Sequence, residues 1–171
     1  LVNMHSGYNG LQSGLSIILI FALSIKSFID GILVNILPVA ALLGAMCAFW
    51  FFNKFPSRVF EGNIGSLMFG SSIGCVIVVQ QYWWFGFFIL IPHTFNFLLW
   101  LLWLIKIRNN PEEHLVNGTH RKFGSVDEKG IIQVPNMLTL KWIPNYFLKM
   151  KEPESTIAIY GITIIFCILS F

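Results

Sequence analysis

The sequence predicts an all-α integral membrane protein with about five transmembrane helices. Hydrophobic residues make up 56% of its 171 residues and charged residues only 11%, and the mean hydropathy is +0.71. Ordinary soluble domains carry about 25% charged residues, so the composition excludes that class. The apolar residues form long continuous runs, each near the roughly 20 residues that a helix needs to cross a bilayer. Strands of a membrane barrel would instead alternate over about ten residues, so a helical bundle is preferred.

The expected spans are residues 13–29, 33–52, 64–81, 84–105 and 155–171. Pro38 and Pro92 lie inside the second and fourth spans, where membrane helices tolerate proline as a kink. His93 and Asn96 follow the second kink. Polar groups inside a membrane invite a functional interpretation. A hydrogen bond between helices, made where Pro92 frees the backbone, is the favoured alternative.

Lysine and arginine set the expected orientation. Of 11 basic residues, only Lys26 lies on one side of the predicted bundle. The other side holds Lys54, Arg58, Lys106, Arg108, Arg121, Lys122, Lys129, Lys141, Lys149 and Lys151. Because positive charge favours the cytoplasmic side, the connections that carry these residues are expected in the cytoplasm.

Three regions follow from this arrangement. Residues 1–105 hold membrane helices with cytoplasmic loops, residues 106–154 form one cytoplasmic segment, and residues 155–171 form the last span. Within 106–154, the stretches 121–126 and 130–134 flank a turn sequence that contains Gly130, which predicts a short β-hairpin. Residues 138–150, interrupted by Pro144, suit a segment that lies at the membrane interface.

Two polar, glycine-containing stretches precede spans that enter from the same side, at residues 3–14 and 56–66. A diphosphate held at a membrane surface needs a divalent cation, a few oxygen ligands and cationic donors. Asn3 and Asn63 offer carbonyl oxygens, and His120 with Arg121 would make a phosphate clamp. Each signal is weak alone, because an asparagine before a helix is more often an N-cap and a basic loop is more often solvated or near lipid headgroups.

Taken together, these motifs are more specific than any one of them. Asn-x-x-x-Gly-x-Asn-Gly-Leu-x-x-Gly at 3–14 and Pro-Ser-Arg-Val-Phe-x-Gly-Asn at 56–63 resemble the polyprenyl-phosphate N-acetylhexosamine-1-phosphate transferases. His-Thr-Phe-Asn-Phe-Leu at 93–98 and the His-Arg pair before the last span are similar too. The resemblance is greatest to the archaeal and eukaryotic dolichyl-phosphate enzymes, with bacterial MraY and WecA more distant. It covers the whole chain and matches the second half of a ten-helix enzyme.

The resemblance implies roles for individual residues. Residues matching Asn3 and Asn63 coordinate magnesium, for which manganese can stand, on the diphosphate of a UDP-sugar. Those matching Asn9 and Phe60 bind uracil, by pairing and by stacking. Those matching His120 and Arg121 contact the diphosphate or the sugar, so Asn63, His120 and Arg121 are the expected catalytic residues. An aromatic face and an amide suit a base on chemical grounds as well.

Two departures from the family pattern are visible. The family has aspartate where this chain has Asn63, which removes a negative charge beside the cation. Glu61, two residues earlier, could compensate, although its side chain is expected to point in a different direction whether the stretch is loop or strand. Natural variation, a degenerate paralogue and an engineered inactivating change all remain open. The family's paired acidic motif lies in its first half and has no counterpart here, and the chain opens with Leu1 rather than methionine. We therefore expect a piece of a longer protein, inactive without its amino-terminal half.

The expected function is transfer of N-acetylglucosamine 1-phosphate from UDP-N-acetylglucosamine to dolichyl or polyprenyl phosphate, which releases UMP and begins lipid-linked glycan assembly. The alternatives are a catalytically inactive membrane subunit of the same fold, motivated by Asn63, and a transporter subunit. Expected partners are the two substrates, membrane lipid, the missing half and a second copy in a homodimer, with no nucleic acid. The membrane would be the archaeal cell membrane or the endoplasmic reticulum, with the site facing the cytoplasm.

Overall fold

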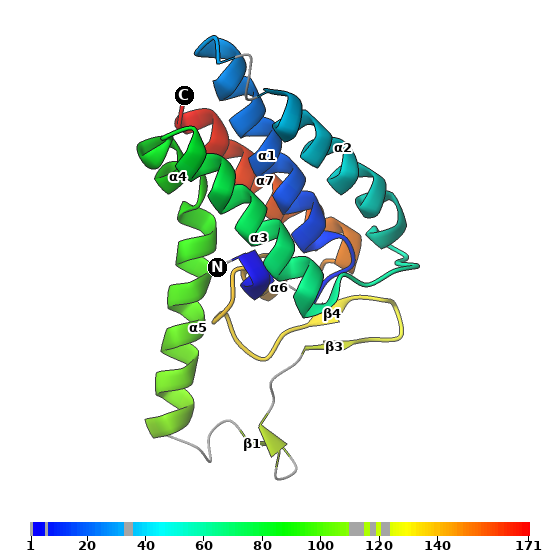
Figure 1. The fold of residues 1–171 in the computed structure, drawn as a ribbon. Helices are drawn as coiled ribbons and strands as arrows, with labels where there is room; N and C mark the ends of the chain where they lie inside the picture. Colours follow the sequence, from blue (N-terminus) through cyan, green and yellow to red (C-terminus); the bar gives the residue numbers. More distant parts are fainter. Residues whose placement is uncertain (1, 6, 33–35, 110–114, 117–118, 121–123) are drawn as a thin grey trace.

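The computed structural model is a helical bundle with a small polar cap at one end (Figure 1). It describes the chain except for residues 1, 6, 33–35, 110–114, 117–118 and 121–123, and it gives only the backbone of residues 115, 116, 119 and 120. The helices are η1 (Val2–His5), α1 (Leu11–Ile29), α2 (Ile36–Asn53), α3 (Gly62–Val79), α4 (Trp83–Ile89), α5 (Ile91–Asn109), α6 (Trp142–Phe147) and α7 (Glu152–Leu169). The strands are β1 (Leu115–Val116), β2 (Thr119–His120), β3 (Ser125–Val126) and β4 (Ile132–Gln133).

Four of the described helices are long and apolar enough to cross a membrane, namely α1, α2, α3 and α7. The pair α4 and α5 passes the same test as one span bent by 56°. This confirms the predicted helical membrane protein of about five spans. The bend falls at Leu90, and Pro92 is the second residue of α5, where its missing N–H breaks no helical bond. Pro38 lies in the first turn of α2, so it does not kink the middle of that helix.

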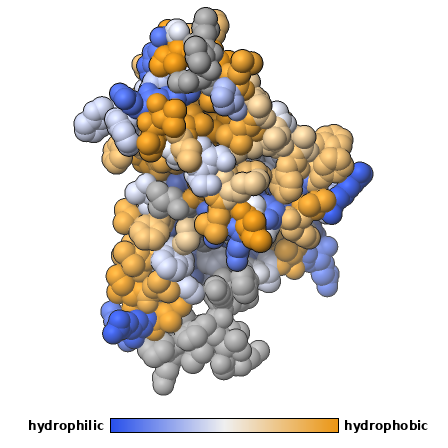
Figure 2. Space-filling model, in the orientation of Figure 1, coloured by the Kyte–Doolittle hydropathy of each residue, from blue (hydrophilic) through white to orange (hydrophobic). Residues whose placement is uncertain are grey.

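Helix α1 is the centre of the bundle and packs against α2, α3 and α7. Of its most apolar stretch, 56% is buried, compared with 17% for α2 and 22% for α3. Leu15, Leu19 and Leu23 on α1 are fully shielded. The outer helices carry apolar side chains on their exposed faces, and Figure 2 shows hydrophobic residues over much of the visible face with hydrophilic residues in smaller, scattered groups. Such a surface suits lipid or further helices rather than water.

The segment that follows α5 is ordered around two small hairpins and a short helix. Strands β3 and β4 pair antiparallel, which confirms the predicted hairpin. Its turn is held by Asp127, whose Oδ1 accepts hydrogen bonds from the backbone N–H of Lys129 at 2.9 Å and of Ile131 at 2.8 Å. The β1–β2 hairpin was not predicted. Pro144 is the third residue of α6, within the first turn, where proline is tolerated.

Asn96 joins three parts of the chain at the polar end of the bundle. Its Nδ2 donates to the carbonyl oxygen of Met4 in η1 at 3.0 Å. Its Oδ1 accepts from the Thr139 hydroxyl at 3.0 Å and from the Leu140 N–H at 2.8 Å. Asn96 is therefore a buried hydrogen-bonding residue, as expected, but the expected bond between membrane helices is not the one it makes. Its partners lie in η1 and in the segment before α6 rather than in another membrane helix.

Candidate functional site

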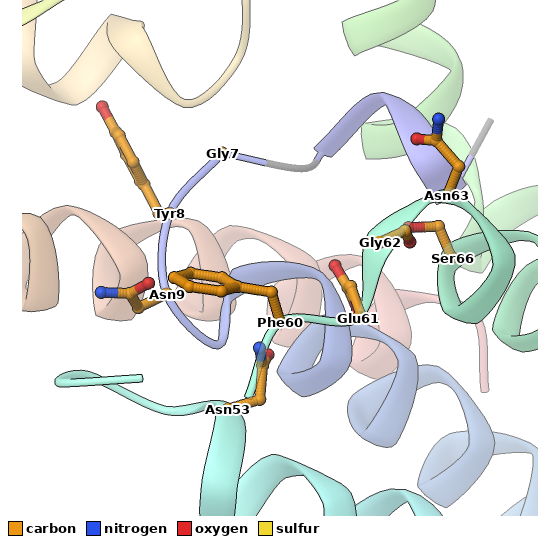
Figure 3. Close-up of a pocket in the computed structure, with 9 residues that line it drawn as sticks. All are labelled: Gly7, Tyr8, Asn9, Asn53, Phe60, Glu61, Gly62, Asn63 and Ser66. Carbon is orange, nitrogen blue, oxygen red and sulfur yellow. The ribbon is translucent and has the colours of Figure 1, made fainter. Parts of the chain in front are cut away.

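A pocket of about 260 Å³ opens at the end of the bundle where α1 and α3 begin and α2 ends (Figure 3). It lies between the turn before α1 and the connection from α2 to α3. Its lining residues are Gly7, Tyr8, Asn9, Asn53, Phe60, Glu61, Gly62, Asn63 and Ser66. Side chains with amide, hydroxyl, carboxylate and aromatic groups thus meet in one hollow. This composition suits a polar ligand that carries a flat ring.

The first wall is the turn formed by residues 7–10. Gly7 and Gly10 have φ of 122° and 74°, a left-handed backbone that favours glycine. The Asn9 N–H donates a hydrogen bond to a carboxylate oxygen of Glu152, the first residue of α7. The Tyr8 hydroxyl accepts from Asn145 Nδ2 at 2.9 Å. Helix α7 and α6 therefore hold this turn from behind, which leaves the Asn9 side chain at the pocket.

Tyr160 on α7 fixes the start of α1. Its hydroxyl donates to the carbonyl oxygen of Gly10 and accepts from the Trp50 indole N–H at 3.2 Å. It can lie there because Gly14 has no side chain: a Cβ at Gly14 would overlap the Tyr160 hydroxyl. The spacing Gly10-x-x-x-Gly14 thus brings α7 close to α1 and positions the pocket turn.

Replacing Gly14 with alanine should therefore destabilise the protein by about 1 to 3 kcal/mol, the usual cost of overpacking. Gly44→Ala in α2 is the matched control, because a Cβ there meets nothing within 4 Å. That change should be neutral or stabilising, since alanine favours a helix. Thermal unfolding of both variants in detergent measures the difference. Equal midpoints would show that Tyr160 does not need the space at Gly14.

The second wall is the connection between α2 and α3. Asn53, the last residue of α2, accepts from the Ser13 hydroxyl at 2.6 Å and donates through Nδ2 to the carbonyl oxygen of Val59 at 2.8 Å. This pair of bonds ties the connection to α1. Phe60 follows with 77% of its surface exposed, and Figure 3 shows its ring beside Asn9. Phe60 therefore offers a free aromatic face to a ligand in the pocket.

The ionisable groups around the pocket are shifted by burial. Burial raises the pKa of Glu61 from 4.5 to about 7. Behind the turn, burial lowers the pKa of Lys141 from 10.5 to about 8, and its Nζ lies 5.5 Å from the centre of the Tyr8 ring. The pKa of His5 is lowered by burial and then by His93 and Lys141. The centroids of the His5 and His93 rings are 4.4 Å apart, and both side chains are buried. Neither histidine lines the pocket.

The structure brings three of the six expected site residues into this pocket, namely Asn9, Phe60 and Asn63. Asn3 lines a neighbouring cavity of about 340 Å³, and Ser66 borders both. The Asn3 Oδ1 atom is buried and has no hydrogen-bond partner. His120 has its backbone in β2, but its side chain and the whole of Arg121 lie outside the described residues.

Of the residues that line the pocket, only Asn53 lies outside the two predicted polar stretches; Tyr8 and Ser66 lie inside them but were given no role. Asn53 carried the clearest available signal, because it is the first polar side chain after a long apolar run. Such a residue is usually a helix end. Only the fold shows that it faces Ser13, which lies 40 positions earlier in the chain.

Comparison of the sequence with known proteins points to the same part of the chain as the pocket. The family model described as "Glycosyl transferase family 4" matches residues 1–81, which contain every residue that lines the pocket. Over almost the whole chain, a Sulfolobus acidocaldarius protein is 32% identical, an alignment that covers 98% of this chain and 48% of that protein. It is provisionally named a UDP-N-acetylglucosamine–dolichyl-phosphate N-acetylglucosaminephosphotransferase. Residues 1–81, which carry the pocket, therefore belong to glycosyl transferase family 4.

Other relatives support the same assignment. A Saccharolobus solfataricus protein with the same provisional name is 28% identical, over 98% of this chain and 49% of its own length. A phospho-N-acetylmuramoyl-pentapeptide-transferase of Listeria welshimeri is 40% identical over 83 residues, 48% of this chain and 26% of that protein. The chain thus spans about half the length of the family 4 relatives that it matches along its whole extent.

Proposed function

We propose that this chain forms part of an enzyme that transfers N-acetylglucosamine 1-phosphate from UDP-N-acetylglucosamine to dolichyl or polyprenyl phosphate. In the reaction, an oxygen of the lipid phosphate attacks the β-phosphorus of the UDP-sugar. The bond from that phosphorus to the bridging oxygen breaks, and UMP leaves with the electron pair. The products are a lipid diphosphate sugar and UMP. The family and the names of its relatives support this class of reaction.

The observation that carries the proposal is the meeting of two distant sequence motifs in one pocket. Asn9 comes from the turn before α1, whereas Phe60 and Asn63 come from the connection before α3. The exposed Phe60 ring would stack on uracil, and the Asn9 amide would pair with an edge of the base. The Asn63 oxygen lies farther along the pocket, where the diphosphate would extend (Figure 3).

A magnesium or manganese ion would suit the oxygen atoms at this end of the bundle. No group of three His, Cys, Asp or Glu that could hold a metal occurs among the described residues. Magnesium, however, needs only one or two protein ligands besides phosphate and water. Two buried oxygen atoms without hydrogen-bond partners are available as ligands: Glu61 Oε2 in the pocket of Asn63, and Asn3 Oδ1 in the neighbouring cavity. The ion would neutralise the negative charge on the diphosphate while that charge shifts to the leaving UMP.

Two further features of the proposed site are the His-Arg pair after α5 and the membrane face on which the pocket lies. Arg121 and His120 would contact the diphosphate or the sugar from the segment after α5. The pocket lies at the end of the bundle that carries Lys54, Lys141 and Lys151, so we place it on the cytoplasmic face. There the headgroup of the lipid phosphate can reach the donor.

An inactive member of the family is the second candidate, and Asn63 is the observation that favours it. Both candidates are tested by supplying labelled UDP-N-acetylglucosamine and dolichyl phosphate to membranes that contain the full-length gene product. The proposed function expects labelled lipid and UMP in equal amounts. Absence of both from membranes with verified protein, while UDP still binds, would favour the inactive member.

The same assay measures what Asn63 contributes. Asn63→Asp adds a carboxylate beside the cation, so turnover should rise, or the magnesium requirement fall, by about tenfold, which corresponds to about 1.4 kcal/mol. Asn136→Asp is the matched control, because Asn136 does not line the pocket. Unchanged turnover and unchanged magnesium dependence in Asn63→Asp would remove position 63 from the cation site.

A further inference from the structure

Glu61 is the only acidic residue that lines the pocket among the described residues. It immediately precedes α3, and its side chain rises toward the turn of residues 7–9, between Phe60 and Ser66 (Figure 3). One of its carboxylate oxygens, Oε2, is shielded from solvent and has no hydrogen-bond partner. The ion pair of Lys26 with Asp30 lies at the opposite end of α1. Glu61 is thus a carboxylate without a described counter-ion.

A shielded carboxylate in this state is unfavourable unless something compensates its charge. Moving an ionised carboxylate fully out of water costs several kcal/mol, and the half-buried Glu61 bears part of that cost unless a cation or hydrogen bonds offset it. Two donors that line the pocket point to the backbone instead of to Glu61: the Asn53 amide donates to the Val59 carbonyl oxygen, and the Ser66 hydroxyl donates to the Gly62 carbonyl oxygen at 2.8 Å. The Ser66 hydroxyl therefore presents oxygen lone pairs, and no hydrogen bond to Glu61, on this side of the pocket.

We propose that Glu61 is an anionic ligand of the divalent cation in this pocket. It supplies the negative charge that the neutral Asn63 amide two residues later does not. This inference rests on the proposed function, because it takes the pocket to be the donor site. The cation would lie between Glu61 Oε2 and the Asn63 carbonyl oxygen, and the remaining positions would be filled by phosphate oxygens and water, as magnesium prefers.

The backbone around Glu61 allows the carboxylate to approach the pocket. Gly62 adopts φ of 59°, which turns the chain into α3 immediately after Glu61. A Cβ at Gly65 would lie 3.1 Å from the Glu61 Cβ, so the absence of a side chain there gives Glu61 room along the helix start. Glu61 and Asn63 therefore reach the same hollow although only one residue separates them.

The test measures cation binding directly, without turnover. The full-length gene product, purified in detergent, is titrated with Mn²⁺, and free Mn²⁺ is followed by electron paramagnetic resonance with and without UDP. Glu61→Gln should weaken Mn²⁺ binding about tenfold or more, as expected when a charged ligand is lost. Adding Asn63→Asp to Glu61→Gln should restore affinity to within about threefold of the original protein, because the charge returns to the same pocket. Glu128→Gln, in the exposed β3–β4 turn, should leave affinity unchanged.

Each other outcome overturns the inference. Unchanged Mn²⁺ affinity in Glu61→Gln, with or without a change in stability, would mean that Glu61 faces a basic group of the complete protein instead of a cation. If adding Asn63→Asp to Glu61→Gln does not restore Mn²⁺ affinity, Glu61 and residue 63 do not bind the same cation. Absence of Mn²⁺ binding to the unaltered protein, with and without UDP, would also reject it. The proposed function fails separately, if UDP does not bind the unaltered protein.

Discussion

Replacing Phe60 with alanine should weaken the binding of UDP by about 1 to 3 kcal/mol, the range for loss of one aromatic stacking partner of a base. The prediction follows from the exposed ring, which no core contact requires: 77% of Phe60 is open to solvent beside Asn9. Because the ring adds little to the folded state, stability should barely change. Calorimetric titration of UDP into the full-length gene product measures the effect.

The control for Phe60 is a phenylalanine of similar exposure elsewhere. Phe87 on α4 is 59% exposed and does not line the pocket. Phe87→Ala should leave UDP affinity unchanged. If Phe60→Ala binds UDP as tightly as Phe87→Ala, Phe60 does not contact the base and the assignment of the pocket to uridine loses its aromatic component.

Replacing Asn96 with leucine should destabilise the protein by about 3 kcal/mol. The change removes three hydrogen bonds, each worth about 1 kcal/mol, and leaves the Met4 carbonyl oxygen and the Leu140 N–H without their partner. Since Met4 belongs to η1, the neighbouring Asn3 should lose its fixed position as well. Unfolding in detergent and the magnesium dependence of UDP binding measure the two consequences.

Asn136 provides the comparison for Asn96. Its Oδ1 accepts a single local bond from the Leu138 N–H at 2.8 Å, so Asn136→Ala should cost about 1 kcal/mol at most. An Asn96→Leu protein that is as stable as Asn136→Ala would show that the connection between η1, α5 and the segment before α6 does not depend on this amide.

The sequence alone was enough to predict the membrane spans and the pairing of two motifs. Long apolar runs report burial in lipid or in a bundle, and they gave α1, α2, α3 and α7 with bounds within a few residues. The bend lies two residues before Pro92, which suits the start of a helix rather than its middle. These features depend on local composition, which a single sequence contains in full.

The features that were missed depend on contacts between distant residues. Nothing in the local sequence of Asn53 indicates that it faces Ser13, or that Tyr160 would reach Gly10 across the space left by Gly14. The same holds for Glu61, whose orientation toward the pocket follows from the left-handed turn at Gly62. Expected roles for His120 and Arg121 remain predictions, because the His120 side chain and Arg121 are outside the described residues.

The most direct test of the account is the location of the donor in the full-length gene product. A structure with UDP-N-acetylglucosamine and Mn²⁺, in which anomalous scattering marks the metal, supplies it. We expect the uracil ring against Phe60 and beside Asn9, with the metal about 2.1 to 2.2 Å from an oxygen of Glu61 or Asn63. A nucleotide bound away from the pocket formed by residues 7–9 and the 53–66 connection would contradict the account.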